Sequence, residues 1–184
     1  MRKIAIISVL LLGVVLSSCL THFFSVPQPV DVKNSKQMPK EIMGEWKKEG
    51  ENEVHIIDKT SWTNITTDSL GNSITKIEHR LCDSLVVKRA GKKYFINTLE
   101  ENGYWILYLG YKDNNRFFVK GLGEADTLTL KTVLKFTPDS VASGNELYYK
   151  QINLTRKQLE KLVKNGGFAD TLIVFDIKSR TIKN

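Results

Sequence analysis

From residue 43 onward, the chain consists of short runs of β-forming residues separated by turn residues. This pattern is typical of an antiparallel sheet that folds into a barrel or a sandwich. The run at residues 103–111 is apolar at both odd and even positions, so we expect a central strand covered on both faces. Residues 128–136 instead alternate between a mostly apolar and a more polar set, which predicts a strand with one buried face.

Two turn signals join predicted strands into hairpins. Ala90-Gly91 separates the runs 84–89 and 93–98, and a polar turn at 112–115 leads from the central run to a strand at 116–120. Weaker runs predict further strands at residues 53–57, 61–66, 73–79, 146–152 and 171–177.

One helix is predicted near the C-terminus. Thr155 and Gln158 have the spacing of a capping box, and Gly166-Gly167 is a pair that commonly ends a helix. Its buried stripe consists of Leu159, Leu162 and Val163. The predicted fold class is therefore mainly β, an antiparallel barrel or sandwich with one α-helix near the C-terminus.

The first residues have the form of an export signal. Arg2 and Lys3 precede thirteen uncharged residues, 4–16, which is the length of a secretory apolar region and less than the roughly 20 residues of a spanning helix. The segment ends in Leu16-Ser17-Ser18-Cys19, which resembles the lipobox of bacterial lipoprotein precursors. The resemblance implies that residues 1–18 are removed and that Cys19 is acylated, which attaches the chain to membrane lipid. An ordinary signal peptide with an incidental Cys19, or an uncleaved anchor, is the alternative.

The residues after Cys19 extend this interpretation. Leu20 occupies the position where an Asp retains many such lipoproteins in the inner membrane, so the resemblance implies the outer membrane. The absence of an acidic run after Cys19 favours its periplasmic face. Residues 19–39 contain three of the four prolines and lack a sustained period, which predicts a flexible tether, with Phe23 and Phe24 in the lipid interface. The domain would then span residues 40–184.

Gly44-Glu45-Trp46 opens this predicted domain. A Gly-x-Trp at the first strand, followed by many antiparallel strands, a helix and a last strand, resembles the order of elements in lipocalins. The resemblance implies a barrel in which Trp46 plugs the closed end or lines the ligand pocket. A more general open barrel or sandwich is the other alternative.

The chain contains few residues suited to catalysis or metal binding. Of its three histidines, His22 lies in the predicted tether, while Glu53 and His55 would share one face of a strand and His79 belongs to another. A metal site with three histidines in the domain is thereby excluded, and we predict no metal, no cofactor and no catalytic residue. Cys82 is expected to be a buried small hydrophobe, with a reactive or intermolecular thiol as the alternative.

The sequence gives little support for nucleotide or nucleic-acid binding. The stretch 121–124 is too short for a dinucleotide loop, and we expect no helix after it. The formal charge of +7 is interleaved with acidic residues instead of forming a stripe, so no nucleic-acid partner is predicted.

A short motif recurs five times: Asp, then Ser or Thr, then an aliphatic residue. It resembles the acceptor motif of an O-glycosylation system of some Gram-negative envelopes. The hydroxyl residues that this would modify are Ser69, Ser84, Thr127, Ser140 and Thr171. The alternative is a turn that leads into an aliphatic strand, which is common in all-β proteins.

We therefore expect a membrane-anchored envelope lipoprotein with a non-catalytic domain that binds another envelope component. The alternative is a lipocalin-like carrier of a small hydrophobic ligand. The aromatic residues available to line its pocket are Trp62, Tyr104, Trp105 and Tyr108.

Overall fold

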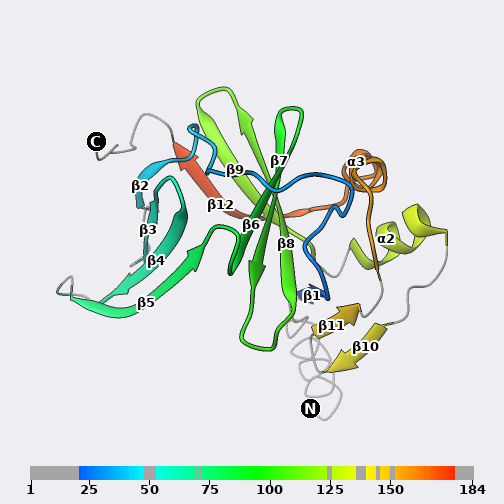
Figure 1. The fold of residues 1–184 in the computed structure, drawn as a ribbon, viewed down its shortest axis with the longest axis horizontal. Helices are drawn as coiled ribbons and strands as arrows, with labels where there is room; N and C mark the ends of the chain where they lie inside the picture. The colour runs from blue at the N-terminus through cyan, green and yellow to red at the C-terminus, as the bar shows by residue number, and fades with distance from the viewer. Residues whose placement is uncertain are drawn as a thin grey trace, which may run out of the picture.

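The computed structural model describes residues 21–47, 53–68, 70, 72–123, 126–135, 140–143, 146–149 and 152–176. Within these residues the chain forms two sheets and two helices, and nearly all strand pairings are antiparallel (Figure 1). The predicted mainly β class, with a helix near the C-terminus, is confirmed.

The smaller sheet contains four consecutive strands, β2 (Gly44–Lys47), β3 (Glu53–Ile57), β4 (Ser61–Thr67) and β5 (Ser73–Arg80). The larger sheet contains eight: β1 (Thr21–Phe24), β6 (Leu85–Ala90), β7 (Lys93–Leu99), β8 (Trp105–Asp113), β9 (Arg116–Gly121), β10 (Ser140–Ser143), β11 (Glu146–Tyr149) and β12 (Asp170–Asp176). The helices are α2 (Asp126–Leu134) and α3 (Arg156–Lys164).

Strand β8 is the centre of the larger sheet, as its apolar sequence predicts. It pairs with β7 on one side, while its other side is shared between β1 at Trp105 and Ile106 and β9 from Tyr108 onward. The sheet therefore divides at β8 into one branch with β1, β11 and β10 and another with β9 and β12. The two predicted hairpins, β6–β7 and β8–β9, are confirmed.

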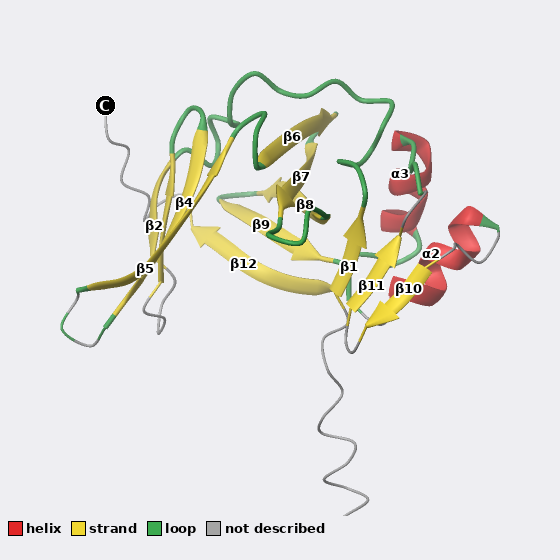
Figure 2. Ribbon diagram, turned by 60° about the horizontal axis from the view of Figure 1, so that its bottom comes forward, coloured by secondary structure: helices red, strands yellow, loops and turns green. Residues whose placement is uncertain are grey.

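Both faces of the larger sheet are covered (Figures 1 and 2). On one face, Phe95 and Leu107 pack with residues of α2 and α3. On the other, Ile96 and Val119 pack with Trp46 and other residues of the smaller sheet. Because neighbouring residues of a strand point to opposite faces, this arrangement explains why the central strands are apolar throughout.

Helix α2 replaces the strand predicted at residues 128–136, so that prediction is wrong. Its buried residues are Asp126, Leu130, Val133 and Leu134, which follow the helical period, whereas Leu128 is 74% exposed. The Asp126 carboxylate fixes the start, because it accepts hydrogen bonds from the backbone N–H groups of Gly123 (2.8 Å) and Phe168 (2.9 Å). The expectation of no helix after residues 121–124 is also wrong.

Helix α3 forms as predicted. The Thr155 hydroxyl accepts a hydrogen bond from the Gln158 backbone N–H, and the Gln158 side chain accepts one from the Thr155 backbone N–H, which completes the capping box. At the other end, Gly166 has a φ of +86° and the Gly167 N–H donates to the Leu162 carbonyl at 2.9 Å. This is the Schellman geometry, which a glycine in the left-handed region allows.

The predicted tether is wrong for residues 21–39, because this segment is part of the folded domain. Strand β1 lies between β11 and β8, and Phe23 and Phe24 are buried in the sheet instead of the lipid interface. Beyond β1, Gln28 is fully buried, and the Lys88 ammonium donates hydrogen bonds to the carbonyls of Pro27 (3.1 Å) and Pro29 (2.7 Å). The prolines therefore belong to a loop whose carbonyl groups are held by the sheet.

The described strands do not close into a barrel. Trp46 lies between the two sheets, where its ring centroid is 4.7 Å from that of Phe175 and its Nε1 donates to the Ile42 carbonyl at 2.8 Å. Trp46 thus fills the contact between two open sheets, and the predicted plug of a closed barrel is wrong.

Candidate functional site

A cleft of about 610 Å³ lies where the smaller sheet meets the larger one. Its apolar wall comes from both sheets and includes Phe23, Trp62, Ile77, Tyr108 and Leu172. A volume in the range of about 300–1,000 Å³ is usual for sites that bind small molecules. The cleft is therefore large enough for a ligand.

Strands β1, β4, β8 and β9 place most of the buried part of the apolar wall. Phe23 of β1 stacks on Tyr148, with ring centroids 4.8 Å apart. Tyr108 and Val119 come from β8 and β9, on the face of the larger sheet that points toward the smaller one. Trp62 comes from β4 and packs edge-on against His55 at 6.0 Å. Each of these side chains is fixed by its neighbours, so the wall is formed in advance of any ligand.

Two large apolar side chains at the cleft remain open to solvent. Ile77 of β5 is 51% exposed and Leu172 of β12 is 43% exposed, and they belong to different sheets. Apolar side chains that gather at a concave surface mark binding sites more often than scattered ones do. We therefore regard the part of the cleft between Ile77 and Leu172 as its mouth.

The polar lining of the cleft has two parts: Asn64 and His79 from the smaller sheet, and Thr98 with the turn between β7 and β8 from the larger one. Glu100, Glu101 and Asn102 line the cleft there. The turn is held by a hydrogen bond from the Glu100 N–H to the Tyr104 carbonyl and by another from the Gly103 N–H to the Glu100 carbonyl, both 2.9 Å. Neither Lys nor Arg contributes to the described lining, although the chain has 27 such residues. The cleft is thus apolar with an acidic rim.

Tyr108 connects the apolar wall to this rim. The Thr98 hydroxyl donates a hydrogen bond to Glu100 Oε1 at 3.3 Å. Burial raises the pKa of Tyr108 to about 12, with a smaller contribution from the Glu100 charge, while a hydrogen bond with Thr98 acts in the opposite direction. The Tyr108 phenol therefore stays protonated near neutral pH and is a hydrogen-bonding group, not a base.

Sequence reasoning found part of this site. Of the four aromatic residues expected to line a pocket, Trp62 and Tyr108 do so, whereas Tyr104 and Trp105 are outside the lining. Phe23 was missed because it was placed in the tether. The acidic pair before the central run was visible in the sequence, but only the turn between β7 and β8 brings it to the cleft.

The residues considered for catalysis or metal binding are dispersed. His55 Nε2 lies 3.6 Å from Glu53 Oε2, which confirms that they share a face, and His79 lines the cleft. In the described ranges, no three His, Cys, Asp or Glu side chains are grouped closely enough to hold a metal ion. Cys82 is exposed, so its predicted burial is wrong. It lies at φ +71° in the turn between β5 and β6.

The five Asp-Ser/Thr motifs occupy different environments. Ser84 is partly buried and its hydroxyl accepts a hydrogen bond from the Arg80 N–H at 2.9 Å. Thr127 is also partly buried, with its hydroxyl 3.4 Å from His22 Nε2, and it lies in the first turn of a helix. Thr171 is exposed on β12 and Ser140 begins β10, while Ser69 lies outside the described residues. The turn-to-strand interpretation thus fits Ser84, since β6 begins at the next residue, but not Thr127.

Cys19 also lies outside the described residues. None of the helices in the described part of the chain is both long and apolar enough to cross a membrane. No family model, no curated protein and no solved structure shows significant similarity to this chain.

Proposed function

We propose that the protein is a cell-envelope lipoprotein, anchored through acyl chains on Cys19, whose non-catalytic domain binds a small and largely apolar molecule in the cleft between its sheets. The anchor rests on the lipobox resemblance of Leu16-Ser17-Ser18-Cys19. The same resemblance supports the outer membrane and its periplasmic face as the location.

One observation carries the binding function. The cleft has an apolar wall that is already ordered, and Ile77 and Leu172 at its mouth are left about half exposed. Covering such surface with an apolar ligand is favourable by about 25 cal/mol per Å² removed from water. The acidic rim gives the ligand an orientation, because its polar group would lie toward Glu100 and Glu101.

The test is native mass spectrometry, with lipid extraction, of the full chain purified from membranes. We expect a stoichiometric ligand on the wild type and its loss in Ile77→Trp, which fills the mouth. Ile74→Trp is the matched control, because Ile74 is exposed on the same strand but outside the cleft lining. A wild-type protein that is free of ligand in repeated preparations would refute the binding function.

The anchor has a separate test. Metabolic labelling with a fatty-acid analogue should mark the wild type and leave Cys19→Ser unlabelled. Label that persists in the mutant would refute acylation at Cys19 without affecting the conclusion about the cleft.

A second candidate function is supported by the edge of the smaller sheet. Among the described strands β5 pairs only with β4, and it exposes Ile74 (66%) and Ile77. Such an edge can accept a strand from another protein. If the domain binds an envelope protein in this way, Ile74→Glu will reduce crosslinking to that partner while the ligand in the cleft is retained.

A further inference from the structure

The first residue that the structure describes follows the proposed anchor closely in the sequence. Cys19 precedes Thr21 by two residues, so their Cα atoms are at most about 8 Å apart. Thr21 is the first residue of β1, which is held between β11 and β8. Since residues 21–39 are not a tether, acyl chains on Cys19 would place the bilayer directly beside the start of β1.

The cleft includes a residue of β1. Phe23 lines it and follows Cys19 by only four residues, which span at most about 14 Å. Leu172, at the mouth, belongs to β12, which pairs with β9 at Gly121. Gly121 pairs in turn with Tyr108 of β8, two residues beyond the Ile106 that pairs with Phe23 of β1. A bilayer that holds Cys19 is therefore within reach of the mouth.

Exposed apolar side chains flank this point. Leu172 is exposed in the lining of the cleft. Leu128 is 74% exposed and follows Thr127, whose hydroxyl lies 3.4 Å from His22 Nε2 on β1. Side chains of this kind are favourable at a lipid surface and unfavourable in water.

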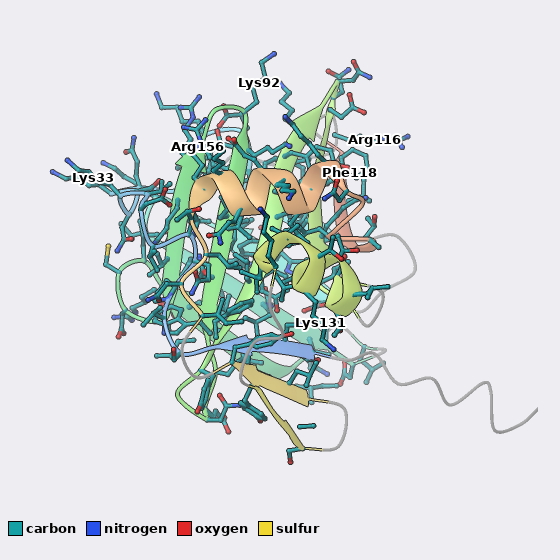
Figure 3. All side chains as sticks on the ribbon, turned by 90° about the vertical axis from the view of Figure 1, so that its right-hand side faces the viewer. Lys33, Lys92, Arg116, Phe118, Lys131 and Arg156 are labelled. Atoms are coloured by element: carbon teal, nitrogen blue, oxygen red, sulfur yellow. The ribbon has the colours of Figure 1, made fainter. Side chains whose placement is uncertain are left out.

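The charges around the molecule are unequal. The described lining of the cleft contains Glu100, Glu101 and His79, and neither Lys nor Arg. Lys92 and Arg116 lie at the end of the molecule away from β10 and β11, whereas Lys131 of α2 lies nearer to these strands (Figure 3). An anionic headgroup at the cleft would meet like charge, whereas an ammonium group would meet two carboxylates.

From this geometry we propose that the cleft takes an acyl chain of an ammonium-headed phospholipid directly from the membrane that anchors Cys19. The acyl chain lies between the two sheets, and the ammonium group lies at the carboxylates of Glu100 and Glu101. This inference rests on the proposed anchor and on the proposed binding function. It adds the source of the ligand and the chemistry of its headgroup.

The headgroup is tested with the full acylated chain in nanodiscs that contain equal amounts of phosphatidylethanolamine and phosphatidylglycerol with identical acyl chains. After detergent extraction, native mass spectrometry identifies the retained lipid. We expect phosphatidylethanolamine to be enriched about tenfold on the wild type, as for one favourable charged contact of about 1.4 kcal/mol. In Glu100→Gln/Glu101→Gln the enrichment should vanish while lipid is still bound. Glu78→Gln/Glu160→Gln removes two carboxylates outside the cleft and should keep it.

The source is tested by inserting twenty Gly and Ser residues between Leu20 and Thr21, which leaves the lipobox and Leu20 unchanged. The longer link should reduce loading from the nanodisc, whereas lipid offered in detergent micelles should still bind. Equal retention of both phospholipids, or unchanged loading after the insertion, would overturn the inference while the binding function stands. A protein that retains neither phospholipid in either experiment would also overturn the inference, whereas the proposed function is refuted only if the wild type purified from membranes carries no ligand.

Discussion

The buried side chain of Gln28 should be one of the strongest attachments of residues 21–39 to the rest of the domain. Its Nε2 donates hydrogen bonds to the carbonyls of Ile152 (2.9 Å) and Val26 (3.0 Å), and its Oε1 accepts one from the Leu154 N–H at 2.8 Å. In Gln28→Ala the Leu154 N–H and the Ile152 carbonyl stay buried without these partners. Each such group costs about 1–3 kcal/mol, so the free energy of unfolding should fall by about 2–6 kcal/mol.

Urea unfolding of the full chain in detergent, followed by tryptophan fluorescence, measures this loss. Gln37→Ala is the matched control, because Gln37 is exposed in the same segment and its replacement should change the free energy of unfolding by no more than about 0.5 kcal/mol. If the two variants unfold at the same urea concentration, residues 21–39 are not held by the Gln28 side chain, and our account of this segment is refuted.

Three other predictions follow from buried or exposed groups. A chain that starts at Val32 lacks β1 and should show no cooperative unfolding transition; a cooperative one would show that β1 is dispensable. Burial lowers the pKa of His22 below 6.5, although its hydrogen bond with Gly123 and the Asp126 charge oppose this. The unfolded state therefore binds the proton more tightly. The free energy of unfolding should be at its full value above pH 6.5 and should decrease below pH 6.5 by up to about 1.4 kcal/mol per pH unit. His22→Gln should reduce this slope in urea titrations. Cys82 is exposed, so iodoacetamide should modify it in the folded protein about as fast as in urea, and strong protection would contradict its exposure.

The strands could be predicted because their signals are local. Alternation and turn residues identify β3 to β9 within their own sequence, and the capping box identifies α3 in the same way. Helix α2 was different, because Leu130 and Leu134 fit a period of two as well as a period of 3.6. The hydrogen bond from the Phe168 N–H to the Asp126 carboxylate, which favours the helix, joins residues 42 positions apart.

The folding of residues 21–39 could not be predicted for a similar reason. Three prolines and the lack of a period are typical of a linker, and no neighbouring residue indicates otherwise. The groups that hold Gln28 come from Asn97 and Ile152, which are 69 and 124 positions away in the chain. Such partners become visible only in the folded structure.

The division of the larger sheet at β8 explains why β1 contributes to the candidate site. Strand β8 pairs with β1 up to Ile106 and with β9 from Tyr108, so Phe23 and Tyr108 lie on one face beside the point of division. Phe24, the next residue of β1, points into the opposite core. A shift of β1 by one residue would exchange the two phenylalanines between cleft and core. The register that completes the core with Phe24 therefore also brings Phe23 to the wall of the cleft.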